Sequence, residues 1–569
     1  MEFRSKLPAK LEQPVSAAVT EWQNGKITRL WARDASLWTN QDEAKWLGWL
    51  DIVERQQKEI AAYRALADDI RNAGFEYALL LGMGGSSLCP EVLAMTFGRQ
   101  TGFPQLSILD STDPAQVRTA LQSVELAKTI VIVSSKSGST LEPNILKQFF
   151  MTKMREAVGD QAGKHFIAVT DPGSHMEQVA KADGFRHILY GDPQIGGRYS
   201  ALSNFGLVPA AVMGLDVEKL LGKARAAVDL AHGTDVKKNP GVELGLILGS
   251  GANMGRDKIT FFTSPRICDL GAWFEQLIAE STGKQGKGIT PVDLEEIAAP
   301  EAYGEDRIFA YVRMEGDDNA RLDAGVERLE KAGQPVVRFA IRDVYDVAAQ
   351  FFTWEIATAV AGSVIGINAF NQPDVEAAKV EARRLTDAYA KTGSLPEEKP
   401  IYADAKIRLY ADAQYAAELG VTGEQNPSVA GILRAHLSRI QPGDYFAALG
   451  FIQRNRQHEE ALQRLRLRVR EAKRVATCLG FGPRFLHSTG QDYKGGPNTG
   501  VFLQITADHG EDLAIPGQKY TFGVVIDAQA QGDLSVLQQR GRRALRAHLG
   551  ADVEAGLAAL NAAVASALS

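Results

Sequence analysis

The chain has 569 residues, 45% of them hydrophobic and 23% charged, and its 63 lysines and arginines against 69 aspartates and glutamates give a net charge of −6. This is the composition of an ordinary globular protein, and it lacks the basic excess typical of a nucleic-acid binder. The three cysteines, at positions 89, 268 and 478, are too few for a disulfide framework or a zinc site. They fit a reducing, cytoplasmic location.

Residues 1–75 have the pattern of helices, with tryptophans at 22, 31, 38, 46 and 49. The first 13 residues contain no apolar run, so we expect no secretory signal. The longest apolar stretch, residues 351–370, contains Glu355 and several small polar residues. It predicts a buried core helix rather than a membrane span, which needs about 20 mostly apolar residues.

Residues 76–214 have the pattern of a first α/β domain. Short apolar runs alternate with stretches of helical length, and each run leads into a polar loop; the runs are 77–81, 106–110, 130–134 and 166–170. Apolar runs without alternation indicate strands buried on both faces, and hence a parallel sheet between helices.

The same pattern predicts two further domains. For a second α/β domain, residues 215–395, we expect strands at 245–249, 258–262, 307–312 and 335–340. A polar linker, 392–400, leads to a smaller α/β domain, residues 400–569, with strands expected at 445–450, 501–505 and 522–526. The predicted fold class is therefore α/β, with two doubly wound parallel sheets and a smaller C-terminal α/β domain.

Two loops rich in Gly, Ser and Thr follow predicted strands, at residues 82–87 and 135–140. Ligands of open parallel sheets bind beyond the carboxyl ends of the strands, and a helix N-terminus favours an anion. The pair of loops therefore favours a phosphate monoester. The Walker A pattern is absent, and Ser87 stands where a dinucleotide fingerprint needs glycine. A single such loop would favour plain turn and cap residues.

Three further segments contain candidate catalytic residues. Arg198 follows two glycines and could stabilise an oxyanion, although a surface arginine in a turn is the commoner case. Gln276 and Glu280 lie on one face of a predicted helix over 271–284. The helix dipole disfavours negative charge at Glu280 and would keep it a proton acceptor; a solvated helix end is the alternative.

The last of these segments follows Pro373, which predicts a helix with Glu376 and Lys379 in its first turn. Glu376 can simply cap that helix. Lys379 is unfavourable to the helix dipole there, so it is expected to face a negative group. The alternative is a solvated surface lysine.

Together these segments resemble the phosphoglucose isomerase family, with five motifs in the family's order over residues ~75–390. Residues 196–200 and 370–379 look like its two signature regions, and 135–140 with 84–86 look like its sugar-phosphate loops. The segment beyond 400 resembles the isomerase half of bacterial transaldolase–phosphoglucose isomerase fusions. Only ~75 residues precede the first strand, far fewer than a (β/α)8 barrel has, so we expect the transaldolase half to be absent.

The resemblance implies two sugar-isomerase (SIS) domains, a homodimer, no cofactor and no metal, and interconversion of glucose 6-phosphate and fructose 6-phosphate through a cis-enediol. It also implies roles for individual residues. Those that would hold the phosphate are Ser135, Lys136, Ser137 and Thr140, and those that would contact the sugar are Gly85, Ser86, Gln276 and Gln372. Glu280 would move the proton, Arg198 would stabilise the enediolate and Lys379 would assist ring opening.

The chain departs from the family at three places. Ser137 stands where many members have Thr, and Asp374 stands where a small residue is usual. The family's ring-opening histidine is missing, since no histidine occurs between residues 232 and 436. We hypothesise that His487 replaces it, with Lys494 near the sugar; the alternative is that His487 only packs in a glycine-rich turn.

Other functions stay open from the sequence. A non-catalytic SIS-domain sensor of sugar phosphates, an isomerase that also acts on mannose 6-phosphate, and a nicotinamide dehydrogenase are the competing predictions. The arginine-rich run 453–474 predicts a solvated helix face, and the last domain is expected to serve catalysis, structure or docking to a separate transaldolase. The expected partner at the site is a sugar phosphate, with neither nucleic acid nor membrane.

Overall fold

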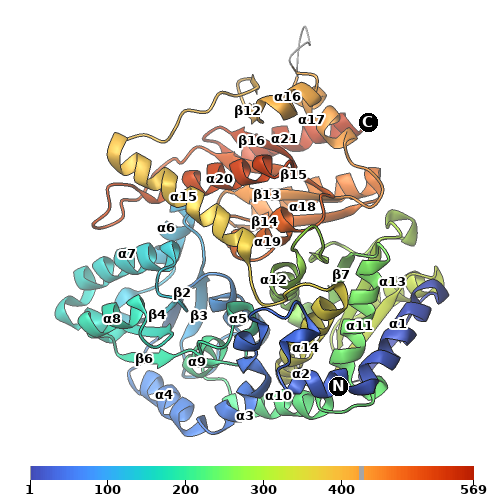
Figure 1. The fold of residues 1–569 in the computed structure, drawn as a ribbon. Coiled ribbons are helices and arrows are strands. Elements are labelled where there is room, and N and C mark those ends of the chain that lie inside the picture. The colour runs from blue at the N-terminus through green and yellow to red at the C-terminus, as the bar shows by residue number, and fades with distance from the viewer. Residues whose placement is uncertain (1, 422–427) are drawn as a thin grey trace.

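The computed structural model describes residues 2–421 and 428–569. Three sheets form the framework, and Figure 1 shows the third lying above the first two. The first sheet has the order β3-β2-β4-β5-β6, and all of its strands are parallel. Its strands are β2 (Tyr77–Leu81), β3 (Gln105–Leu109), β4 (Thr129–Ser134), β5 (Phe166–Thr170) and β6 (His187–Tyr190).

The second sheet has the order β1-β10-β9-β7-β8 and is parallel except at one edge. Its strands are β1 (Glu2–Lys6), β7 (Lys258–Thr263), β8 (Thr290–Val292), β9 (Arg307–Met314) and β10 (Val336–Ile341). The edge strand β1 pairs antiparallel with β10. The expectation that the whole of residues 1–75 is helical is therefore wrong at its start, because β1 is too short and too polar to stand out in the sequence.

The third sheet has the order β11-β12-β16-β15-β13-β14. Its strands are β11 (Tyr402–Ala403), β12 (Ile407–Tyr410), β13 (Tyr445–Phe451), β14 (Ala476–Phe481), β15 (Gly500–Ala507) and β16 (Arg543–Leu549). β13 to β16 are parallel, whereas β11 and β12 add antiparallel strands at one edge. The predicted α/β class with three parallel-rich sheets is confirmed.

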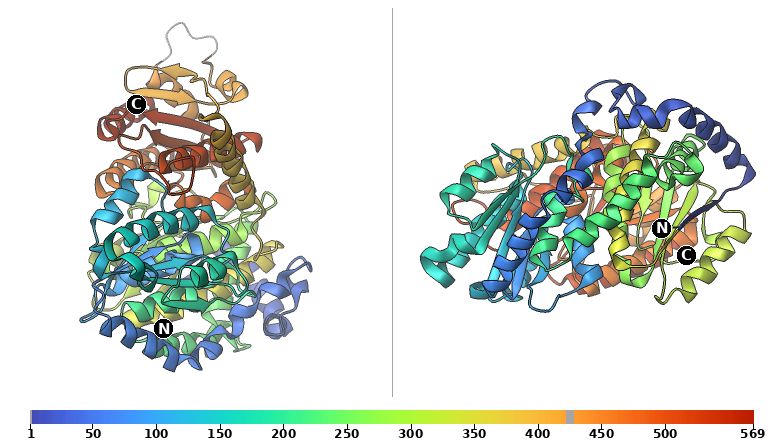
Figure 2. Two further views of the ribbon diagram at one scale, coloured as in Figure 1. Left: turned by 90° about the vertical axis from the view of Figure 1, so that its left-hand side faces the viewer. Right: turned by 90° about the horizontal axis from the view of Figure 1, so that it is seen from below.

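Helices cover these sheets (Figures 1 and 2). Those before and around the first sheet are α1 (Ala9–Glu21), α2 (Ile27–Trp31), α3 (Ile52–Gln57), α4 (Ile60–Asn72), α5 (Leu88–Phe97), α6 (Pro114–Gln122), α7 (Leu141–Val158), α8 (His175–Ala182) and α9 (Asn204–Val212). Those of the middle segment are α10 (Val217–Ala231), α11 (Pro240–Asn253), α12 (Leu270–Thr282), α13 (Ala320–Lys331), α14 (Val347–Ile365) and α15 (Pro373–Thr392). Those of the last segment are α16 (Ala413–Glu418), α17 (Val429–Ser438), α18 (Arg456–Lys473), α19 (Gly490–Gly495), α20 (Phe522–Gln539) and α21 (Val553–Leu568).

Two apolar runs expected as strands are helical. Residues 245–249 lie inside α11, and 522–526 begin α20. Both runs are buried nearly all round, and a fully buried helix turn has the same local pattern as a buried strand. The expected core helix is confirmed: α14 is buried along most of its length, and no helix among the described residues is long and apolar enough to cross a membrane.

One long helix, α15, leads from the middle segment of the chain to residues 400–569. α15 follows α14, packs against α19 and runs along α20 beside the third sheet (Figure 1). The loop after β14 returns the other way and reaches α12 through α19. The last segment therefore lies against both sheets at the ends where their loops gather.

Candidate active site

A pocket of ≈ 380 Å³ collects most of the residues that the sequence singled out. Eleven of the twelve candidate site residues line it; they are Gly85, Ser86, Ser135, Lys136, Ser137, Thr140, Gln276, Glu280, Gln372, Lys379 and His487. The twelfth, Arg198, is buried beside the lining residue Gly197. The pocket thus lies where four parts of the chain come together. They are the loops of the first sheet, α12, α15 and the C-terminal segment, residues 400–569.

The loop after β4 forms one wall of this pocket and leads into α7. The Ser135 hydroxyl is buried and makes no hydrogen bond to the described residues. Lys136 pairs with Asp171, which also lines the pocket, and burial of Asp171 raises the pKa of its carboxyl despite that lysine. A cation, a free hydroxyl and the N-terminus of an 18-residue helix suit a phosphate group.

The loop after β2 packs tightly against the opposite wall. Gly85 has no room for a side chain, because a Cβ there would collide with the carbonyl of Gly197. Gly84, at φ +56°, lies against the Gln276 amide and the His487 carbonyl. Glycine at these two positions therefore lets the loops meet.

Glu280 lies near the C-terminal end of α12 and is 8% exposed. Gln276, one turn earlier, donates from Nε2 to Glu280 Oε2 at 3.1 Å and to the His487 carbonyl at 2.8 Å. Nη1 of Arg198 lies 3.6 Å from Glu280 Oε1. These contacts fix one buried carboxylate at the wall of the pocket, where it can accept a proton from a bound substrate.

Arg198 is almost fully buried, with 2% exposure, and its guanidinium is held on every side. It donates to Ser281 Oγ at 2.7 Å and to Gln372 Oε1 at 2.9 Å. It also donates to the carbonyls of Ala369 and Asn371. Such a fixed cation is suited to stabilise negative charge that develops close to Glu280.

Lys379 lies in the second turn of α15, one turn later than expected, while Glu376 is in the first turn and is exposed. Lys379 lines the pocket and makes no ion pair within 4.0 Å among the described residues. Its charge lowers the pKa of Glu142. The expectation that Lys379 faces a negative group stays a prediction, because Glu142 acts on it only from beyond ion-pair distance.

His487 ends a short 3₁₀ turn, η13 (Arg484–His487), and is 8% exposed. Its Nε2 lies 3.0 Å from Glu142 Oε1, and Gln529 of α20 donates to the same oxygen at 2.7 Å. Burial raises the pKa of Glu142, but His487 and Lys379 outweigh burial, so the pKa lies below its usual range. Thr112 in turn donates to Gln529 at 2.6 Å.

Lys494 does not reach this pocket. Its ammonium lies 2.5 Å from Asp533 Oδ1, and both side chains are buried. The expectation of Lys494 near the sugar is wrong, because α19 turns this side chain toward α20 instead.

Some lining residues lie outside the candidate site residues. Met83, Gly197 and Val375 belong to segments that the sequence singled out, whereas those not selected are Trp46, Ser134, Pro143, Asp171 and Pro193. Glu142 was also missed, although its place two residues after the phosphate-type loop was visible in the sequence. Neither Glu142 nor Trp46 belongs to a local motif that could have identified it.

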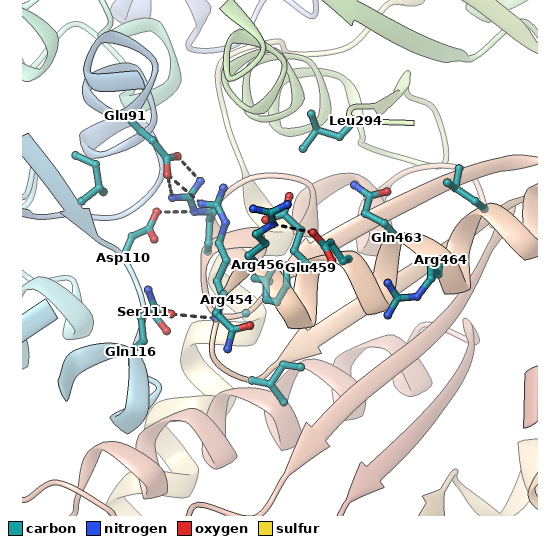
Figure 3. A pocket seen from close by; sticks show the side chains of 18 of the residues that line it. Glu91, Asp110, Ser111, Gln116, Leu294, Arg454, Arg456, Glu459, Gln463 and Arg464 are labelled. Atoms are coloured by element: carbon teal, nitrogen blue, oxygen red, sulfur yellow. Dashed lines mark hydrogen bonds and ion pairs between the residues drawn. The ribbon is translucent and has the colours of Figure 1, made fainter. Parts of the chain in front are cut away.

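A larger cavity, of ≈ 760 Å³, lies elsewhere, between the first sheet and the third segment (Figure 3). Glu91 forms ion pairs with Arg454 and Arg484, and Arg484 Nε lies 2.7 Å from Asp110. Figure 3 labels Glu91, Asp110 and Arg454 of this cluster. Carboxylates therefore neutralise Arg454 and Arg484. These ion pairs connect the first sheet to residues 400–569 along this cavity.

The arginine-rich helix next to this cavity is not simply a solvated face, as expected. Within α18, Arg466 is 1% exposed and Arg470 4% exposed. Arg466 donates to the carbonyls of Thr477 and Asp293, and Arg470 to the carbonyl of Glu296. Arg466 and Arg470 therefore connect residues 400–569 to the loop at residues 293–296, which follows β8.

No group of three or more His, Cys, Asp or Glu side chains within residues 2–421 and 428–569 is arranged to hold a metal ion. The expected absence of a cofactor stays a prediction.

Comparisons with known proteins agree with this geometry. The family model for phosphoglucose isomerase matches residues 72–307. The glucose-6-phosphate isomerase of Rubrobacter xylanophilus is 30% identical over 394 residues, which cover 60% of this chain and 88% of the relative. The Thermus thermophilus enzyme of the same name is 28% identical over 383 residues, covering 59% and 89%.

Two solved structures have a similar fold. A hypothetical protein from Thermus thermophilus superposes with a TM-score of 0.59 at 26% identity, covering 67% of this chain and 99% of that one. A glucose-6-phosphate isomerase from Chlamydia trachomatis superposes with a TM-score of 0.50 at 20% identity, covering 64% and 78%. The second likeness concerns the fold alone.

Proposed function

The chain belongs to the phosphoglucose isomerase family and interconverts glucose 6-phosphate and fructose 6-phosphate, and we propose which of its residues carries out each step. The observation that supports the assignment most strongly is the position of Glu280. Its carboxylate is fixed between Gln276 and Arg198 in a pocket whose other walls contain the Lys136 loop and Lys379. A proton acceptor, an anion site and a fixed cation thus share one small cavity.

In this proposal the substrate's phosphate binds to Ser135, Lys136, Ser137 and Thr140, and Gly85 and Ser86 lie along the sugar. When the phosphate arrives, it competes with Asp171 for Lys136. Gln276 and Gln372 orient the hydroxyls. Binding therefore fixes C1 and C2 of the sugar relative to the Glu280 carboxylate.

The chemistry begins with ring opening. A proton leaves the O1 hydroxyl of the cyclic aldose, the C1–O5 bond breaks and O5 is protonated, with His487 and Lys379 as the exchanging groups. Nε2 of His487 faces Glu142, so its Nδ1 is the nitrogen that remains for the sugar. The hydrogen bond to a carboxylate orients the ring in the same way as in other carboxylate–histidine pairs.

Isomerisation follows on the open chain. Glu280 removes the proton from C2, the electron pair forms the C1–C2 double bond of the cis-enediol, and O1 becomes negative. Arg198 stabilises this oxyanion. The protonated Glu280 then returns the proton to C1, the proton of the O2 hydroxyl moves to O1, and C2 becomes the ketose carbonyl while O1 becomes a hydroxyl. No redox group is consumed in this sequence.

The pocket favours an enzyme over a non-catalytic sensor, because binding alone needs no buried carboxylate beside a fixed arginine. Nothing in the geometry favours action on mannose 6-phosphate. Three finer expectations stay predictions: a homodimer, docking to a separate transaldolase and a cytoplasmic location. The three free cysteines are compatible with the last. Since His487 comes from the same chain as Glu280, ring opening as proposed needs no partner subunit.

The test is a coupled assay of fructose 6-phosphate conversion with the Glu280→Gln variant. We expect wild-type turnover, and a loss of ~10²–10⁴-fold or more in the variant, as is typical for removal of a general base. Glu376→Gln, on the exposed first turn of α15, is the matched control and should retain turnover. Full activity of Glu280→Gln would refute the assignment of the base.

A further inference from the structure

A second pocket, of ≈ 470 Å³, shares a segment of chain with the catalytic one. Gln372 and Val375 line the catalytic pocket, whereas Asn371, Pro373 and Asp374 line the second one. The start of α15 thus separates two cavities. The mechanism above uses only the first of them.

The second pocket contains a buried guanidinium whose charge is not paired. Arg542 is 8% exposed and donates through Nη2 to the carbonyls of Lys494 and Gly496, at 2.6 and 2.8 Å. Its Nε is buried and has no hydrogen-bond partner among the described residues. Carbonyls do not neutralise a cation, and burial of an uncompensated charge is costly.

The surrounding charges do not remove this imbalance. Among the described residues, no carboxylate comes within 4.0 Å of Arg542; Asp492 and Asp374 act on it only from farther away. Burial lowers the pKa of Arg542, and the neighbouring Arg540 adds to this effect. The negative charge of an anion in the pocket would offset both effects on the pKa of Arg542.

The other lining cations strengthen the case. Arg540 lies 2.5 Å from Asp374 Oδ1 but is 39% exposed, so it can also turn toward a ligand. Lys284 donates to two carbonyls, and burial lowers its pKa well below the usual range. Two arginines, Arg540 and Arg542, and two lysines, Lys284 and Lys494, line the pocket, and Asp374 is the one carboxylate among the described lining residues. Lys494 is already paired with Asp533, so the two guanidinium groups are the cations left for a ligand.

We propose that this pocket binds a small phosphate-bearing anion, free phosphate or a phosphate monoester, through the guanidinium groups of Arg540 and Arg542. Arginine suits this role because its planar fork matches phosphate oxygens. Gly495 and Gly496 also line the pocket, and a side chain at either would collide with the carboxylate of Asp374 or Asp492.

The site is coupled to the catalytic pocket through the start of α15. Asp374 pairs with Arg540 and also accepts from Gln491 Nε2 at 2.7 Å. Gln491 Oε1 in turn accepts from the backbone N–H groups of Asp374 and Val375. An anion that draws Arg540 away from Asp374 therefore acts on the helix that carries Lys379. The pocket is an effector site for the isomerase, and this part rests on the proposed function.

Binding is tested by titrating the full chain with inorganic phosphate in a calorimeter. We expect two phosphates per wild-type chain, one at the Lys136 loop and one at Arg542. Lys136→Ala should retain one, and Lys136→Ala with Arg542→Gln none. Loss of the Arg542 contacts should weaken the second event ~10- to 100-fold, as expected for charged hydrogen bonds. Arg71→Gln, on the surface of α4, is the matched control.

Arg542→Gln could also disturb the fold, since Arg542 holds two carbonyls. Arg540→Gln, whose side chain is partly exposed, gives an independent variant that should weaken the same event, with circular dichroism unchanged. One phosphate per wild-type chain, or two in the Arg542→Gln and Arg540→Gln variants, would overturn the inference. A second phosphate in a chain without isomerase activity would support the site and refute only the proposed function.

Discussion

Replacing Glu142 by Gln tests whether His487 opens the sugar ring. The substitution preserves shape and a hydrogen bond at His487 Nε2, but it removes the negative charge. A hydrogen bond to a charged group contributes about 1.5–3 kcal/mol and a neutral one about 0.5–1.5. The difference of about 1–1.5 kcal/mol corresponds to about 5- to 13-fold in rate at 1.36 kcal/mol per tenfold. His487→Ala removes the group itself and should cost ~10²–10⁴-fold.

The assay compares a cyclic with a permanently open substrate. Fructose 6-phosphate forms a furanose ring through its C5 hydroxyl, whereas 5-deoxyfructose 6-phosphate cannot. Deuterium uptake from D₂O at C1, followed by NMR, measures proton transfer by Glu280 on both. We expect Glu142→Gln and His487→Ala to lose kcat/KM on the cyclic sugar and to keep it on the open one.

Two outcomes would refute this reasoning. Equal losses on both substrates would mean that Glu142 supports the pocket rather than ring opening. Full activity of His487→Ala on the cyclic sugar would mean that His487 only packs in its turn.

Two further predictions concern stability. Asp533→Asn leaves the Lys494 ammonium buried without its charged partner, which should lower the free energy of unfolding by ~3–5 kcal/mol and Tm by several degrees. Asp527→Asn is the control, because Asp527 pairs with His509 and is half-exposed. Equal Tm shifts in the two variants would contradict this expectation. Burial raises the pKa of Asp492 from 3.8 to about 6, so the folded chain binds more protons than the unfolded chain between these pH values. The free energy of unfolding should therefore fall by about 3 kcal/mol as the pH rises from about 4 to 6. Asp492→Asn cannot ionise, so its Tm advantage over wild type in thermal scans should grow across that range and then level; a constant difference would disprove the shift.

The parts of the site that depend on local sequence could be predicted. A buried strand followed by small residues and a helix places the loop at residues 135–140. Helical spacing alone puts Gln276 and Glu280 on one face of α12. Here chain neighbours determine the geometry, so one stretch of sequence is sufficient.

The parts that depend on distant contacts could not be predicted in this way. Glu142 and His487 are 345 positions apart, and nothing in either segment reveals the other. Lys494 has the same local character as a site lysine, yet Asp533 determines its direction. The strands expected at 245–249 and 522–526 failed for a related reason, because burial by distant elements makes helix and strand look alike.

The pairing of β1 with β10 has a consequence for synthesis. The ribosome makes β1 about 330 residues before β10. At ~5–20 residues per second, β1 therefore stays unpaired for roughly 17 to 66 s until β10 is made. Glu2, Arg4 and Lys6 give this waiting strand a charged side chain at every second position, which discourages pairing with a neighbouring nascent chain. Once β10 emerges, the same charged strand becomes the outer edge of the finished sheet and protects it from the edges of other copies.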